Sequence, residues 1–279
     1  MKKIFTSFFL CFFLLAGCSN EPLLDRSMAV KQSTVDLKEN ITSDFIPSTY
    51  TIVSIGDSLT QGVGDSTKRG GYLPYLEERL EEEKSVEDAV FYNFGVSGNR
   101  TSQVLNRVKT QEVKAALKKA DIVMITTGGN DVMKVVRENF TGLQLEDFDK
   151  ALIGYEKTLS SLIQSIQKEK PDATIVLIGL YNPFYAYFNE MKELDMVMKK
   201  WNQVSQSVLQ KYENTIFVDI ADEFRENEEN LLYTDYFHPN DQGYQLIAEK
   251  AFTTLQDEAL HDLADKKFLA MKKGNEEDE

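Results

Sequence analysis

Short apolar runs and longer amphipathic stretches alternate along the chain from residue 51 onward. The apolar runs are rich in β-branched and aromatic residues, which predicts strands over residues 51–55, 89–94, 122–126, 173–180 and 215–220. Between them, apolar residues recur at spacings of three and four, which predicts helices. These helices are expected over residues 72–84, 101–119, 146–168, 187–211 and 240–257.

This alternation determines the predicted fold class. Strands that are apolar at nearly every position are buried on both faces, and helices between them provide the crossovers of a parallel sheet. We therefore predict an α/β protein, a three-layer α/β/α sandwich with a flavodoxin-like arrangement and a central five-stranded parallel sheet. In such sheets, sites lie at the carboxyl ends of the strands.

Small polar clusters occur where this rule expects a site. Three of them directly follow predicted strands: residues 56–60 (GDSLT), 93–99 (NFGVSGN) and 128–131 (GGND). A fourth lies near the end of the chain, at residues 235–240 (DYFHPN). We expect the four clusters to meet at one edge of the sheet.

The residue types in these clusters suit acyl transfer. A serine hydroxyl such as that of Ser58 is a weak nucleophile until a base takes its proton. His238 is one of only two histidines in the sequence, which narrows the choice of base. Asp235, three residues earlier, is placed to orient the imidazole and stabilise its protonated form. This set predicts a Ser58–His238–Asp235 triad.

An acyl-transfer intermediate also needs donors for its oxyanion. The candidates are the Ser58 N–H, the Gly98 N–H and the side-chain amide of Asn130. Each of these residues also has a simpler interpretation as a turn or helix-cap residue. For the two neighbouring acids, Asp57 and Asp131, we prefer a structural role in holding their loops.

Together the clusters resemble the SGNH hydrolase superfamily, also called the GDSL esterases and lipases. Its four named residues fall on Ser58, Gly98, Asn130 and His238, with the accompanying acid at Asp235, and the resemblance covers about residues 50–255. It implies a hydrolase domain over residues 48–258 that uses no metal and no cofactor. It also implies Ser58, His238 and Asp235 as catalytic residues, and Ser58, Gly98 and Asn130 as the oxyanion hole.

The expected activity is that of a serine esterase or lipase. We expect cleavage of carboxylic esters or thioesters through an acyl-serine intermediate, with lipid-like acyl substrates favoured. Removal of acetyl groups from envelope polysaccharide is one alternative. A non-catalytic envelope-binding lipoprotein is another, because fold does not imply function. The natural substrate and the oligomeric state stay open.

The N-terminus predicts export. Lys2 and Lys3 precede an apolar run over residues 4–15 that is shorter than the roughly 20 residues a spanning helix needs, as in a secretory signal peptide. Residues 15–18 (LAGC) resemble the lipobox of bacterial lipoproteins, which implies a signal peptide over residues 1–17 and lipidation of Cys18. An ordinary signal peptide or short anchor is the alternative. The expected location is extracytoplasmic, lipid-anchored to the cell membrane.

Charge and cysteine content exclude several other classes. The chain has 31 basic and 45 acidic residues, a net charge of −14, which disfavours binding to nucleic acid or directly to anionic membranes. Its two cysteines, Cys11 and Cys18, lie in the N-terminal segment, which excludes an internal disulfide framework and a cysteine-based zinc site.

Four segments have less certain roles. Residues 18–47 are expected to be a polar tether, or else an extra helix packed on the domain. The aromatic residues 181–188 and an expected insertion over residues 132–145, with Phe140, Leu143 and Leu145, either line a substrate cleft or pack into the core. Residues 259–279 are expected to form a charged C-terminal tail after a fraying helix.

Overall fold

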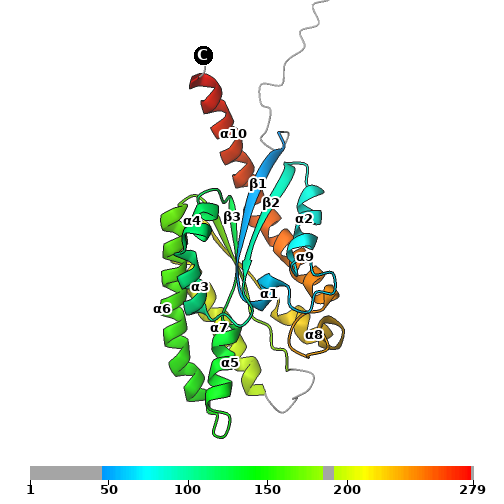
Figure 1. The fold of residues 1–279 in the computed structure, drawn as a ribbon, viewed down its shortest axis with the longest axis vertical. Coiled ribbons are helices and arrows are strands. Elements are labelled where there is room, and N and C mark those ends of the chain that lie inside the picture. Colours follow the sequence, from blue (N-terminus) through cyan, green and yellow to red (C-terminus); the bar gives the residue numbers. More distant parts are fainter. Residues whose placement is uncertain (1–45, 185–191, 278–279) are drawn as a thin grey trace, which may run out of the picture. The chain divides into compact units, whose positions relative to one another are not determined.

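The computed structural model describes residues 46–184 and 192–277 (Figure 1). Its five strands lie in the order β2-β1-β3-β4-β5 and every neighbouring pair is parallel. They are β1 (Ser48–Gly56), β2 (Val86–Gly95), β3 (Ile122–Thr126), β4 (Thr174–Ile178) and β5 (Thr215–Val218). This is the flavodoxin-like order, so the predicted fold class is confirmed.

Helices cover both faces of the sheet (Figure 1). The helices are α1 (Ser58–Gln61), α2 (Leu73–Glu81), α3 (Thr101–Val108), α4 (Gln111–Leu117), α5 (Gly129–Glu138), α6 (Leu145–Glu169), α7 (Lys192–Leu209), α8 (Ala221–Leu231), α9 (Asp241–Glu258) and α10 (Leu260–Glu277). Buried residues of α3, α4, α5, α6 and α7 pack on one face, and those of α2, α8, α9 and α10 pack on the other.

Strands β1, β3 and β4 are largely buried on both faces because their side chains alternate between two apolar cores, whereas the edge strand β2 is mostly exposed or half-buried. In β1, for example, Val53 and Ile55 belong to the core under α3 and α6, whereas Ile52 belongs to the core under α2 and α9. Every residue of β3 and β4 is buried. A strand with apolar residues at consecutive positions is stable only between two such layers.

The helix predicted over residues 101–119 is divided into α3 and α4. Val104 and Val108 of α3 are buried one turn apart, but the next buried residue, Val113 of α4, follows after five positions. Five positions are about 140° out of phase with a helical face of 3.6 residues per turn, so one continuous helix would turn Val113 away from the core. The break at Thr110, whose backbone is extended, restores the inward face.

The expected insertion over residues 132–145 is mostly regular structure. Helix α5 extends to Glu138, with Val132 and Val135 buried, and α6 begins at Leu145. Phe140 is 82% exposed, and Leu143 and Leu145 are also exposed, so none of the three packs into the core.

The C-terminal segment differs from the solvated tail that its charges suggest. Helix α10 packs on α9, and Leu260, Leu263 and Ala264 belong to the core. Further along the helix, the Lys267 ammonium lies 2.8 Å from the Asp121 carboxylate at the start of β3. The first half of α10 is therefore part of the packed fold.

Two of the N-terminal predictions lie outside the described residues: the signal peptide over residues 1–17 and Cys18. The tether predicted over residues 18–47 lies outside them up to residue 45. Within the described residues, no helix combines the length and the hydropathy required to cross a bilayer.

Candidate active site

Ser58 lies at the carboxyl end of β1, where the chain turns from strand to helix. Asp57 is the N-cap of α1, and its carboxylate accepts a hydrogen bond from the Leu59 N–H at 3.1 Å. Ser58 is the first residue of this short helix and is almost fully buried. The strand end and the cap together fix the direction of the Ser58 side chain.

His238 comes from the other end of the chain and contacts Ser58. The ring nitrogen Nε2 lies 2.9 Å from Ser58 Oγ, although 180 positions separate the two residues. The other ring nitrogen, Nδ1, lies 2.6 Å from Asp235 Oδ2. When the carboxylate accepts a hydrogen bond from the Nδ1–H, the imidazole presents Nε2 as the acceptor for the serine hydroxyl.

Asp235 also folds the segment that carries His238. Its Oδ1 accepts hydrogen bonds from the N–H groups of Phe237 and His238, both at 3.0 Å. Partial burial would raise the pKa of this carboxyl, but the His238 ring and these two N–H groups outweigh burial and hold the pKa below its ordinary value. Asp235 is therefore a carboxylate at neutral pH and an acceptor for the ring.

Asn130 lies beside Ser58 at the start of α5. Its amide nitrogen donates to the carbonyl oxygen of Asn99 at 3.1 Å, which joins the cluster after β3 to the cluster after β2. A side-chain amide nitrogen carries two protons, so one N–H is still available for a substrate oxygen. Among the predicted oxyanion residues, Ser58 and Asn130 line the same cavity.

Gly98 lies in the turn between β2 and α3 and is exposed. Its φ of +78° is in the left-handed region, which favours glycine. A Cβ added there would meet no heavy atom within 4 Å, so backbone conformation rather than crowding accounts for the glycine. Gly98 is not among the residues that line the cavity, and its N–H stays a predicted oxyanion donor.

Asp57 and Asp131 hold the loops of the site through hydrogen bonds. Asp57 accepts from the Thr126 hydroxyl at 2.9 Å, and Thr126 in turn lies 2.8 Å from the Thr60 hydroxyl. Asp131 accepts from both the N–H and the hydroxyl of Thr101 at 2.8 Å. These bonds tie the ends of β1 and β3 and the start of α3 together.

A small cavity of about 40 Å³, partly open to solvent, lies beside Ser58. Most of its walls are apolar. The side chains that carry this apolar character are Leu59, Met133, Ile178, Leu180, Tyr181, Pro183, Met198 and Phe237. Met133 of α5 and Met198 of α7 were not predicted from the sequence, because an apolar residue on a helix gives no signal of which cavity it reaches. Leu180, by contrast, follows the carboxyl end of β4, and this position in the sequence could have indicated that it faces the site.

The aromatic residues after β4 both line this cavity and join the core. The Tyr181 ring stacks on Phe224 at 4.1 Å between ring centroids, and its hydroxyl donates to the carbonyl oxygen of Phe237 at 2.6 Å. Phe184 is partly buried against the core. The rest of the aromatic segment, from residue 185 to 188, lies outside the described residues. By contrast, Phe140, Leu143 and Leu145 are not among the lining residues.

Comparison with known proteins places this site in a family. The model of the GDSL-like Lipase/Acylhydrolase family matches residues 54–246. The chain is 35% identical over 211 residues to the uncharacterized protein YpmR of Bacillus subtilis (strain 168), covering 75% of this chain and 82% of YpmR. It is 28% identical over 209 residues to the spore germination lipase LipC of Bacillus licheniformis, covering 72% of this chain and 94% of LipC.

Solved structures show the same likeness. The lipase Lip_vut3 from a goat rumen metagenome has a TM-score of 0.67 and 25% identity, covering 74% of this chain and 97% of the lipase. A point mutant of Axe2, an acetyl-xylooligosaccharide esterase from Geobacillus stearothermophilus, has a TM-score of 0.57 and 25% identity, covering 76% of this chain and 96% of that esterase.

Proposed function

Because the chain belongs to the GDSL-like lipase/acylhydrolase family and is an ester-bond hydrolase, we propose that it cleaves carboxylic esters or thioesters through an acyl-serine intermediate. The observation that supports this mechanism most directly is the hydrogen-bonded chain from Ser58 through His238 to Asp235, with distances of 2.9 and 2.6 Å. Each member has a distinct role in acyl transfer.

In the first half of the reaction, Ser58 Oγ attacks the acyl carbon while His238 Nε2 takes its proton. Asp235 holds the imidazole through Nδ1 and stabilises its protonated form. The Ser58 N–H, the Gly98 N–H and the Asn130 amide donate to the negative oxygen of the tetrahedral intermediate. His238 then gives its proton to the leaving oxygen or sulfur, and the acyl group stays on Ser58.

In the second half, water replaces the leaving group. His238 takes a proton from water, the resulting hydroxide attacks the acyl carbon, and Ser58 recovers its proton as the carboxylic acid is released. No metal takes part in these steps.

The apolar cavity indicates which part of the substrate is bound where. The leaving group must lie within reach of His238 Nε2, and His238 is not among the residues that line the cavity. Asn130, the side-chain donor for the oxyanion, does line it. This lining favours an acyl group over a leaving group as the occupant of the cavity, and we propose that it binds a lipid-like acyl chain.

A second candidate substrate is an acetyl ester of a polysaccharide. The structural likeness to the acetyl-xylooligosaccharide esterase Axe2 favours it. The two candidates predict different chain-length profiles. Each methylene that enters an apolar cavity contributes about 0.8 kcal/mol, which is roughly fourfold in kcat/KM. An acetyl esterase would instead lose activity as the chain grows.

The test is hydrolysis of para-nitrophenyl esters from acetyl to palmitoyl by the wild type and by Ser58→Ala. We expect kcat/KM to rise with chain length to an optimum beyond acetyl, and we expect Ser58→Ala to abolish turnover while remaining folded. Ser207→Ala is the matched control, because the Ser207 hydroxyl is exposed and bonds only within α7, to the Gln203 carbonyl at 2.8 Å. Turnover by folded Ser58→Ala would refute the acyl-serine mechanism, and an acetyl optimum would favour the second candidate.

We further propose that lipidation of Cys18 anchors the protein outside the cytoplasm. The support is the short apolar run followed by LAGC at residues 15–18. Two or more acyl chains bind a bilayer stably, whereas one chain binds marginally.

A further inference from the structure

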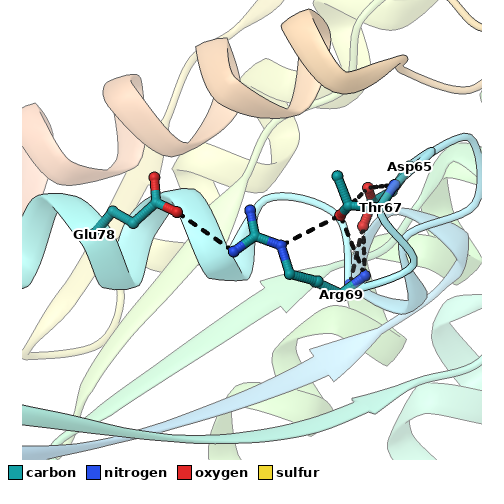
Figure 2. A network of polar contacts seen from close by, with 5 residues as sticks. Asp65, Thr67, Arg69 and Glu78 are labelled. Atoms are coloured by element: carbon teal, nitrogen blue, oxygen red, sulfur yellow. Dashed lines mark hydrogen bonds and ion pairs between the residues drawn. The ribbon is translucent and has the colours of Figure 1, made fainter.

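Asp65 is a buried acid that no step of the mechanism uses. Its Oδ1 accepts from the N–H and the hydroxyl of Thr67 at 2.8 and 2.6 Å. Its Oδ2 accepts from the N–H groups of Arg69, Gly70 and Gly71 at 3.0, 3.1 and 3.1 Å. Figure 2 shows this cluster with Arg69 extending toward Glu78 of α2, where their charged groups lie 3.4 Å apart. One carboxylate thus organises the whole turn.

The conformation of this turn needs that support. Gly64, Lys68, Gly70 and Gly71 all have positive φ, between 57° and 117°. Such a run of left-handed residues has a large conformational entropy cost on folding. Burial raises the pKa of the Asp65 carboxyl, but the hydrogen bonds from Thr67 and the backbone outweigh it and hold the pKa below the ordinary value.

The same turn contacts the His238 segment, meaning residues 235–240, and the first turn of α9, which follows it, at three points. A Cβ added to Gly64 would lie 2.3 Å from the Pro239 carbonyl oxygen and 3.4 Å from His238 Cβ, so the two backbones are in direct contact. The N–H and the hydroxyl of Ser66 both donate to the Asp241 carboxylate. At the start of the turn, the Val63 carbonyl accepts from the Tyr244 hydroxyl at 2.7 Å.

The turn is also joined to Ser58 by the backbone. The N–H groups of Gly62 and Val63 donate to the Ser58 carbonyl oxygen at 2.9 and 3.0 Å. The turn of residues 62–71 is therefore bonded to the backbone of Ser58 and also packs against His238, which lies 180 positions after Ser58 in the sequence.

We propose that Asp65 is a positioning residue for His238: its carboxylate folds the turn of residues 62–71, and the turn holds the His238 segment at hydrogen-bonding distance from Ser58. This rests on the proposed function, because it assigns a role within the same Ser58–His238 pair.

The test is Asp65→Asn in the full chain. The amide would keep one oxygen as an acceptor but would direct its N–H groups at the donors that now bind the other oxygen, so the turn would lose part of its support. We expect kcat to fall about tenfold to a hundredfold, since small misplacements of a catalytic group have effects of this size. KM should change less than threefold, because Asp65 does not line the acyl cavity.

A second readout separates positioning from substrate binding. A para-nitrophenyl phosphonate with a short alkyl group reacts when Ser58 Oγ displaces para-nitrophenolate from phosphorus and His238 takes the proton. Its second-order rate constant should fall in Asp65→Asn by the same factor as kcat. Wild-type values of both quantities in the folded variant would overturn the proposal.

Asp121→Asn is the matched control for a merely structural loss. The Asp121 carboxylate also holds the fold together, because it accepts from the Thr51 N–H and from Lys267 Nζ at 2.8 Å. It directly precedes β3, at the amino ends of the strands, whereas the site lies at their carboxyl ends. We expect it to lower stability and leave kcat and phosphonylation unchanged. If it lowered both as much as Asp65→Asn does, a positioning role for Asp65 would be refuted.

Ser66→Ala keeps the proposal testable should Asp65→Asn fail to fold. It removes the bond of the hydroxyl to Asp241 and leaves the Asp65 cluster intact. We expect kcat to fall about twofold to threefold, with unchanged KM; a folded variant with wild-type kcat and phosphonylation would count against the proposal. Ser58→Ala separates a failure of the proposed function from a failure of this inference. Turnover without Ser58 refutes the proposed function. Ser58-dependent turnover together with wild-type kinetics of Asp65→Asn refutes only the positioning role of Asp65.

Discussion

At the scale of the residue, the proposed oxyanion role of Asn130 can be tested by substitution. Asn130 is the second residue of α5, its amide donates to the Asn99 carbonyl, and it lines the same cavity as Ser58. Removing one preorganised oxyanion donor typically lowers kcat about 10²–10³-fold. We expect a loss of this size for Asn130→Ala on a para-nitrophenyl ester.

Asn139→Ala is the control from the same helix. Asn139 is the C-cap of α5 and its amide donates to the Val135 carbonyl at 3.0 Å. It should lower kcat less than threefold. An Asn130→Ala variant that behaved like Asn139→Ala would remove the oxyanion role and leave Asn130 as a loop-tying residue.

Asp57 gives a prediction about pH. Burial is the largest influence on the Asp57 carboxyl and raises its pKa, against the hydrogen bonds from the Leu59 N–H and the Thr126 hydroxyl. An acid with a raised pKa in the folded state binds more protons folded than unfolded. The free energy of unfolding therefore falls as pH rises above the unfolded pKa of about 3.9 and through the higher folded value.

Asp57→Asn removes this ionisation and keeps an oxygen for the Leu59 and Thr126 bonds. Relative to the wild type, the variant should gain stability as pH rises from about 4 to about 8. Urea unfolding at the two pH values measures the change. A stability difference that is the same at both would mean that the carboxyl does not titrate differently in the folded and unfolded states.

At the scale of the element, most of the fold is predictable because the central strands are buried on both faces. Apolar residues at consecutive positions leave little choice of structure in β3 and β4. The polar clusters that follow the strands then indicate at which ends of the strands the site lies. The chemistry of serine and histidine indicates Ser58 as the nucleophile and His238 as its base. The structure brings these two side chains into contact.

What the sequence did not predict depends on packing between distant elements. The turn of residues 62–71 carries polar and glycine residues that are typical of a plain loop, and its contact with Pro239 arises only when α9 packs beside α2. Met198 lies on an amphipathic helix, where reaching a cavity and packing in a core give the same pattern. In α10, the many Lys and Asp residues suggested a solvated tail. The few apolar residues that the helix buries are too widely outnumbered by these charges to indicate packing.

Helix α10 offers a direct test of that last point. Leu263 is 4% exposed, and Leu269 on the same helix is 57% exposed. Leu263→Ala should lower the free energy of unfolding by about 2–5 kcal/mol, as buried leucines do. Leu269→Ala, the matched control, should change it by less than about 0.5 kcal/mol. Urea unfolding of the two variants decides, and equal small effects would mean that α10 is dispensable for folding.

At the scale of the whole molecule, β1 begins almost at the start of the described residues and ends next to the site. The strand runs from Ser48 to Gly56, about 30 Å at 3.3 Å per residue, and Ser58 follows its carboxyl end. Ser48 and Ser58 therefore lie at opposite ends of β1. Under the proposed lipidation of Cys18, the attachment and the chemistry are separate parts of the molecule.

Cys18→Ser tests this separation. Without a site for acylation, the protein should leave the membrane fraction of cells that make it once the apolar run over residues 4–15 is removed with the signal peptide, because the remaining acidic chain has no other expected affinity for an anionic bilayer. Its kcat/KM on a soluble para-nitrophenyl ester should stay within about twofold of the wild type, since the residues that line the acyl cavity all lie beyond residue 56. Fractionation and ester kinetics on the same preparations give both results. Retention of Cys18→Ser in the membrane fraction would refute the lipid anchor, and a large fall in kcat/KM would instead mean that the N-terminal segment contributes to catalysis.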